Sequence, residues 1–138
     1  MELISLIQFA GIMHLGILAA GALMPGIVGF NKHIKLLTPF LQSLFKVYYG
    51  FIGGTVVAFG SISFFLADNL AYGGPVANAI LLTMTLFWLA RFGVALFVFD
   101  LTPFLTNRWR RIGYQLTNIA FLYLPTVYGY AFLKGITQ

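Results

Sequence analysis

Four charge-poor apolar segments fill almost the whole chain and constrain its fold more than any other feature. Asp, Glu, Lys and Arg are absent from residues 3–31, 47–67 and 112–133, and residues 69–99 contain only Arg91. A bilayer core about 30 Å thick is crossed by roughly 20 apolar helical residues, so each segment is long enough to span it. The sequence therefore predicts an all-α membrane protein with short connections and no soluble domain.

We expect one transmembrane domain over residues 1–138, folded as a four-transmembrane-helix bundle. The four helices are predicted at residues 3–29, 39–67, 75–99 and 103–133. Thr-Pro pairs at positions 38–39 and 102–103 mark two of these starts. Threonine caps helix N-termini, and proline is tolerated at the first helical position because its missing N–H would be unpaired there anyway.

One short motif occurs twice. Leu-Thr-Pro-Phe-Leu at residues 37–41 recurs at residues 101–105. One interpretation is two tandem helical hairpins related by a pseudo-two-fold axis along the membrane normal. The other is that Thr-Pro is a good helix start used twice, because the remainder of the two halves aligns poorly.

Composition excludes several classes of chemistry. The chain is 60% hydrophobic and 8% charged, with a mean hydropathy of +0.93, whereas ordinary globular chains carry about 25% charged residues. It has no cysteine, which rules out disulfides, thiol catalysis and cysteine-based metal sites. No HExxH motif, Gly-rich phosphate loop or Ser/His/Asp arrangement is present. We therefore expect a non-catalytic protein without a metal site.

Basic residues gather on one side of the membrane, in or near the connection between the first and second predicted helices and that between the third and fourth. They are Lys32, Lys35, Lys46, Arg108, Arg110 and Arg111, against Lys134 alone on the other side. The positive-inside rule places both termini outside the cytoplasm, in a bacterial inner membrane. Anionic lipid headgroups are the expected contacts of five of these side chains: Lys32, Lys35, Arg108, Arg110 and Arg111. An outer aromatic belt is expected from Tyr72, Tyr123, Tyr128 and Tyr130.

Arg91 is the most costly residue for a bilayer. A charge at mid-helix costs about 2.5–3.5 kcal/mol on insertion scales, so such a side chain faces the bundle interior or snorkels to the interface. Phe87 and Trp88 lie on the Arg91 side and can cover the guanidinium by cation–π contact. Asp100 falls on the opposite helix face. The functional interpretation makes Arg91 an anchor for an anion, a carbonyl or a propionate; the alternative is snorkelling.

His14 is the second candidate, near mid-membrane in the first predicted helix. Helical rise places it within about 6 Å of Arg91 in depth. A membrane histidine can be an axial ligand of haem or chlorophyll. His14, Arg91 and Trp88 thus form a candidate site for haem, chlorophyll or quinone. The alternative is a hydrogen-bonded core histidine.

Gly50, Gly54 and Ala58 form a row of small residues in the second predicted helix. Such rows let helices approach closely, either inside the bundle or against a partner.

Several short motifs resemble, in their order, those of a group of small four-helix bacterial integral membrane proteins that are still uncharacterised. They are His14, Pro25, Leu37-Thr38-Pro39-Phe40, Tyr49-Gly50 and Phe87-Trp88-Leu89-Ala90-Arg91. The resemblance covers about residues 10–130. It implies no activity, but it places His14 and Arg91 within the shared pattern.

Three functions are compatible with these features. The first is an accessory or structural subunit of a larger membrane complex of respiratory or photosynthetic type, bound to other membrane subunits or to copies of itself. The second is a haem-, chlorophyll- or quinone-binding membrane protein that uses His14 and Arg91. The third is a small oligomeric transporter or channel in which Arg91 selects an anion.

Overall fold

The computed structural model describes residues 2–99 and 102–137. Its elements, in chain order, are α1 (Leu3–Val28), α2 (Phe30–Ile34), α3 (Pro39–Phe65), α4 (Ala67–Tyr72), α5 (Pro75–Phe97), η1 (Thr102–Phe104) and α6 (Arg108–Ile136). Helices α1, α3, α5 and α6 are long and apolar enough to cross a membrane. The prediction of an all-helical chain with four helices able to cross a membrane is confirmed over these residues.

Two predicted helix ends agree closely with the structure. Helix α1 ends at Val28, where Gly29 adopts a left-handed conformation with φ of 71° that glycine reaches without strain. Helix α3 begins at Pro39, and the Thr38 hydroxyl accepts a hydrogen bond from the Leu41 amide at 3.4 Å. The first Thr-Pro pair therefore acts as predicted.

The predicted second and third helices are shortened. The second does not continue to residue 67, because α3 ends at Phe65 and the short α4 follows as a separate helix. The third ends at Phe97, two residues earlier than expected.

The predicted start of the last helix at Pro103 is wrong. Residues 102–104 form only one 3₁₀ turn, and α6 begins at Arg108. The Asn107 side chain caps α6 by accepting from the Arg110 amide at 2.9 Å. Arg110 and Arg111 donate from their side chains to the carbonyls of Phe104 and Leu105 at 3.2 and 3.3 Å. These bonds give the preceding carbonyls partners outside a helix, so the two Thr-Pro pairs differ in structure.

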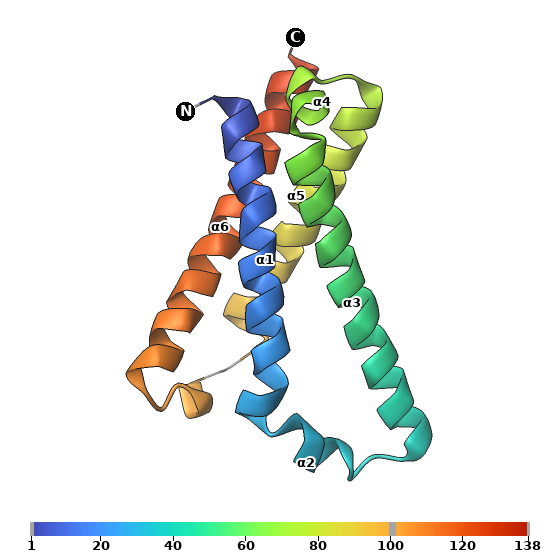
Figure 1. Ribbon diagram of the computed structural model, residues 1–138, viewed down its shortest axis with the longest axis vertical. Helices are drawn as coiled ribbons and strands as arrows, with labels where there is room; N and C mark the ends of the chain where they lie inside the picture. Colours follow the sequence, from blue (N-terminus) through green and yellow to red (C-terminus); the bar gives the residue numbers. More distant parts are fainter. Residues whose placement is uncertain (1, 100–101, 138) are drawn as a thin grey trace.

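The long helices pack along one another in a simple order. Helix α1 packs on α3 and α6, α6 packs on α5, and α4 lies against α1, α3, α5 and α6. Figure 1 shows both chain ends at one end of the molecule and α2 at the other. The basic connections therefore lie at the end opposite to the termini.

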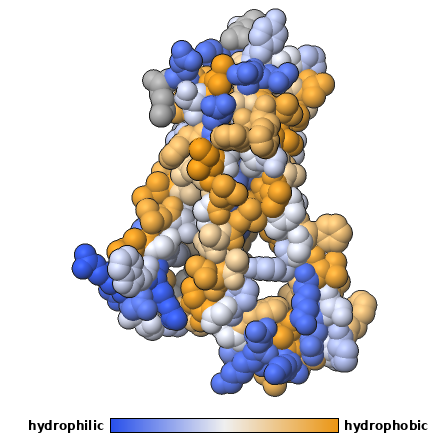
Figure 2. Space-filling view, in the orientation of Figure 1, coloured by the Kyte–Doolittle hydropathy of each residue, from blue (hydrophilic) through white to orange (hydrophobic). Residues whose placement is uncertain are grey.

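Burial divides the four long helices into two halves. The packed half, nearest the chain ends, comprises residues 3–14, 56–65, 75–88 and 120–136, together with α4. The open half comprises residues 15–28, 39–55, 89–97 and 108–119. Every buried residue of the long helices belongs to the packed half. In Figure 1, α1, α3 and α6 spread apart toward the basic connections, and Figure 2 shows gaps between them there.

Glycines bring α1 and α3 together in the packed half. A Cβ atom on Gly11 would lie 2.9 Å from the Gly60 carbonyl oxygen and from the Phe64 nitrogen. A Cβ atom on Gly60 would lie 2.8 Å from the His14 Cβ. These are shorter than real carbon contacts, so only glycine allows the two backbones to approach so closely.

One hydrogen bond joins α1 and α3 in the open half. Pro25 has no N–H, so it cannot donate to the Gly21 carbonyl one turn earlier. The Tyr49 hydroxyl of α3 donates to that carbonyl instead. A neighbouring helix thus satisfies the backbone group that the proline leaves free, which a bilayer requires.

Candidate functional site

His14 is the last residue of the packed half in α1 and is 1% exposed. Its Nδ1 lies 2.7 Å from the Ala10 carbonyl oxygen. A carbonyl only accepts hydrogen bonds, so Nδ1 carries the hydrogen, and Nε2 of the neutral ring is an acceptor. Nε2 is buried and has no hydrogen-bond partner within the described residues.

Trp88 of α5 packs against His14. The two rings lie edge to face with centroids 5.1 Å apart, and the Tyr128 ring of α6 lies 6.3 Å from His14. Trp88 is 1% exposed, and its indole N–H has no partner in residues 2–99 and 102–137. The structure therefore brings His14 and Trp88, two of the predicted site residues, into direct contact.

Arg91 lies one helical turn beyond Trp88. Its guanidinium carbon is 5.2 Å from the centroid of the Phe121 ring and 5.4 Å from that of Phe99. These rings take the place of Phe87 and Trp88, the predicted cation–π partners. The Arg91 side chain is half-buried, and one terminal nitrogen is buried without a partner in the described part of the chain.

Phe121 connects the elements of this site. Its ring stacks on Trp88, with centroids 5.9 Å apart and planes 26° apart, and also lies under the Arg91 guanidinium. His14, Trp88 and Arg91 are thus joined through aromatic contacts. The predicted placement of Asp100 falls outside the described residues.

Ser63 and Tyr128 form a buried pair that sequence reasoning missed. Both are 0% exposed, and their hydroxyls are hydrogen-bonded between α3 and α6. The prediction that Tyr128 belongs to an outer aromatic belt is therefore wrong. Its side chain is buried because its hydroxyl has a polar partner in the interior. The spacing of Val56, Gly60 and Ser63 places them on one face of α3, and this spacing could have indicated that Ser63 faces the interior.

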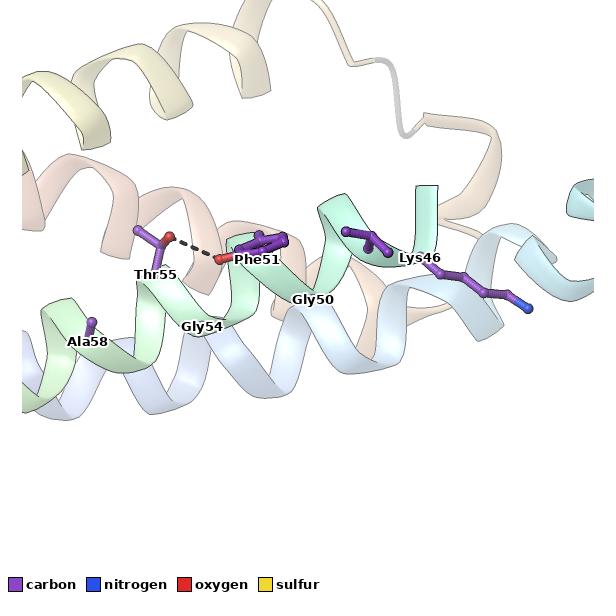
Figure 3. Close-up of a pocket in the computed structure, with 7 residues that line it drawn as sticks. Lys46, Gly50, Phe51, Gly54, Thr55 and Ala58 are labelled. Carbon is purple, nitrogen blue, oxygen red and sulfur yellow. Dashed lines mark hydrogen bonds between the residues drawn. The ribbon is translucent and has the colours of Figure 1, made fainter. Parts of the chain in front are cut away.

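The predicted row of small residues faces outward. Gly50, Gly54 and Ala58 are exposed, and a Cβ atom on either glycine would meet nothing within 4 Å. The row borders a shallow cavity of about 570 Å³ (Figure 3). The residues around it are Lys46, Val47, Gly50, Phe51, Gly54, Thr55 and Ala58. The Thr55 hydroxyl is satisfied by the Phe51 carbonyl at 2.9 Å, so the cavity is largely apolar.

The predicted headgroup contacts lie at the basic end of the molecule. Lys32, Lys35, Arg108 and Arg111 are exposed, whereas Arg110 is half-buried. Arg110 and Arg111 also hold the connection before α6 through the carbonyl bonds described above.

The packing around His14 does not fit a macrocycle. An axial ligand needs an open side at Nε2 where the metal and its planar ring can lie. Here Nε2 is inaccessible, and the rings of Trp88 and Tyr128 lie against the imidazole. No group of three or more His, Cys, Asp or Glu side chains suited to a metal ion occurs among the described residues.

Comparison with known proteins adds no relative: no protein-family model, curated protein or solved structure matches this chain.

Proposed function

We propose that this protein is a non-catalytic subunit of a larger membrane complex, of the respiratory or photosynthetic type, and that it docks through α3. The observation that carries the proposal is the exposed row of Gly50, Gly54 and Ala58 beside a shallow apolar cavity. Helices in lipid associate by close van der Waals packing, which small residues permit. This chain leaves the row uncovered, because α3 approaches α1 through other residues, among them Gly60 and Phe64.

Substitution on the row tests this function. Gly54→Leu fills the cavity and should remove the protein from its complex while leaving its fold intact, since no other side chain occupies that space. Gly16→Leu is the matched control, because Gly16 is exposed on α1 with nothing within 4 Å. The measurement is native gel electrophoresis of gently solubilised membranes. A particle of unchanged size for Gly54→Leu, or a lone monomer that transports a substrate in liposomes, would contradict the proposal.

A second candidate function is ligand binding at His14, Trp88 and Arg91. It is supported by three buried polar atoms that have no hydrogen-bond partner among residues 2–99 and 102–137: His14 Nε2, the Trp88 indole nitrogen and one Arg91 terminal nitrogen. Leaving a buried polar group unpaired costs about 1–3 kcal/mol, and a ligand that pairs with such groups recovers part of this cost. The packing around His14 favours a quinone-sized head group over haem or chlorophyll. A Soret or chlorophyll absorption band in the purified protein would reverse that preference.

We also propose that the basic connections face the cytoplasm of a bacterial inner membrane, with both termini on the other side. Support comes from the grouping of Lys32, Lys35 and Arg108 at one end of the molecule.

We infer further that the four helices form a bundle of two hairpins, α1 with α3 and α5 with α6, since these pairs pack along each other. The two hairpins are not strict copies, because the second Thr-Pro pair starts a 3₁₀ turn instead of a long helix.

A further inference from the structure

We propose that Arg91 binds the anionic head group of an amphiphile, a carboxylate or a phosphate, whose acyl chain lies in the open half. This inference rests on the second candidate function and names its ligand class. It follows from the chemistry of Arg91, from the distribution of acidic residues and from the shape of the open half.

The edge of the Arg91 guanidinium can donate hydrogen bonds to an acceptor. The rings of Phe99 and Phe121 form cation–π contacts with the guanidinium, with centroids 5.4 and 5.2 Å from its central carbon. Aromatic rings engage the cation through their faces, so these two contacts do not use its N–H groups as hydrogen-bond donors. One terminal nitrogen indeed lacks a partner in the described residues. Paired N–H donors in a planar fork match the two oxygens of a carboxylate or phosphate.

A second donor lies close by. Trp88 precedes Arg91 by three residues, so the two side chains project from neighbouring positions on one helix face. Both contact the same Phe121 ring, and the Trp88 indole N–H has no partner within the described ranges. His14 Nε2 is an acceptor, and its lone pair repels an anion. His14 therefore forms the inner end of the site, and the head group belongs on the Arg91 side.

Charge favours an anion over a neutral carbonyl. Arg91 is always protonated in proteins, and the chain has only three acidic residues. Glu2 precedes α1 and Asp68 lies in α4, both at the end of the molecule opposite to the basic connections. The third, Asp100, lies outside the described residues. An anion bound beside Arg91 would neutralise its charge within the bilayer, where an unneutralised arginine is costly.

The open half provides room for an acyl chain beside Arg91. Arg91 lies six residues before the end of α5 at Phe97, or about 9 Å along the helix from that end. None of the open-half residues of the long helices is buried, and gaps separate the helices there (Figure 2). An amphiphile can thus reach Arg91 from the bilayer without unfolding the packed half.

The chain offers its own optical probe for a test. It contains only two tryptophans, Trp88 at the site and Trp109, which is 81% exposed. A Trp109→Phe variant in detergent therefore reports on Trp88 alone. Titration with a fatty acid brominated beside its carboxylate should quench this fluorescence to saturation. The methyl ester of the same acid, which has no charge, should quench only weakly.

Substitutions at Arg91 and Asp100 complete the experiment. Arg91→Gln in the same background should weaken binding about tenfold to a hundredfold, the range expected for lost charged hydrogen bonds. Asp100→Asn should retain binding. Much tighter binding in Asp100→Asn would show that Asp100 already neutralises Arg91 within the chain and would overturn the proposal. Unchanged circular dichroism and elution volume would show that the Arg91 variant is folded.

Parallel samples in nanodiscs distinguish the source of the anion. Quenching by brominated phosphatidylglycerol but not by the zwitterionic brominated phosphatidylcholine would assign the site to an anionic phospholipid. Quenching by the fatty acid alone would assign it to a carboxylate. Equal quenching by charged and neutral probes, or quenching that survives Arg91→Gln, would overturn the proposal. Quenching of Trp88 by a neutral quinone alone, with a dependence on Arg91, would contradict an anionic ligand. The second candidate function, ligand binding at this site, would still be supported.

Discussion

The packed half and the open half contain the same kinds of residues but differ in structure. Helix α1 carries small residues in both: Gly11 touches the backbone of α3, whereas Gly16 has nothing within 4 Å. Every residue buried in the long helices lies in the packed half. Small residues therefore permit close packing but do not produce it, and a complementary surface on the facing helix is also required.

Polar groups differ between the halves in the same way. In the packed half, the hydroxyls of Ser63 and Tyr128 pair with each other, and the Tyr123 hydroxyl donates to the Leu6 carbonyl at 3.0 Å. In the open half, the bond from Tyr49 to Gly21 ties α1 to α3. Interior hydrogen bonds and backbone contacts thus hold the packed half together, while none of the open-half residues of the long helices is buried.

The largest expected effect concerns the orientation of the two ends in the membrane. The chain has no cysteine, so single-cysteine variants can be labelled without background. Tyr72→Cys, at a side chain 87% exposed beside the termini, should react with an impermeant thiol reagent in intact cells. Leu36→Cys, 83% exposed at the basic end, should react only after the membrane is permeabilised. The reverse pattern would invert the proposed topology.

The next largest effect is expected at the glycine contact in the packed half. Gly11→Leu should destabilise the protein by about 3 kcal/mol or more, because the obstacle is the backbone at Gly60 and Phe64 and not a flexible side chain. Thermal unfolding in detergent, with monodispersity by chromatography, measures this loss. Gly16→Leu, the matched change in the open half, should stay within about 0.5 kcal/mol of the parent. Equal losses at the two positions would remove the distinction between the halves.

A smaller effect is expected from the buried hydroxyl pair. Tyr128→Phe leaves the Ser63 hydroxyl without its partner and should cost about 1–2 kcal/mol in unfolding free energy. Tyr130→Phe, at a side chain 56% exposed two residues away, should cost less than about 0.5 kcal/mol. Adding Ser63→Ala to Tyr128→Phe should cost less than the sum of the single changes, because both remove the same bond.

The smallest effect on stability is expected from Tyr49→Phe, which removes the bond to the Gly21 carbonyl in the open half. An interhelical hydrogen bond in a membrane contributes about 0.6 kcal/mol on average. Tyr48→Phe is the control, because Tyr48 is exposed and forms no hydrogen bond within the described residues.

The clearer consequence of Tyr49→Phe is structural. Spin labels at positions 23 and 47, both exposed in the open half, should show a broader distance distribution in the variant. Labels at positions 9 and 65, exposed in the packed half, should show no change. Broadening at both pairs of labels would mean that the loss of this bond loosens the helix packing in both halves.

Sequence reasoning succeeded where local chemistry decides the structure. The helix start at Thr38 and Pro39 depends on a cap that adjacent residues supply. It failed at Pro103, where the same dipeptide begins only a 3₁₀ turn. There, the Asn107 cap and the arginine side chains that bind the carbonyls of Phe104 and Leu105 favour a later start of α6. Those contacts compete with the proline signal and are not visible in the dipeptide itself.

The sequence by itself determined the helical, membrane-spanning class of this chain and the grouping of its basic residues, because run length and charge position are read directly along the chain. Only the tertiary structure decided which helix faces meet. It placed His14 against Trp88, used Gly11 and Gly60 for close contact, and left Gly50 and Gly54 outside. The physical reason is that lipid-facing and interior positions are both apolar. The periodicity of apolar residues along a helix then says little about which face is interior, and shape complementarity between helices selects the contacts.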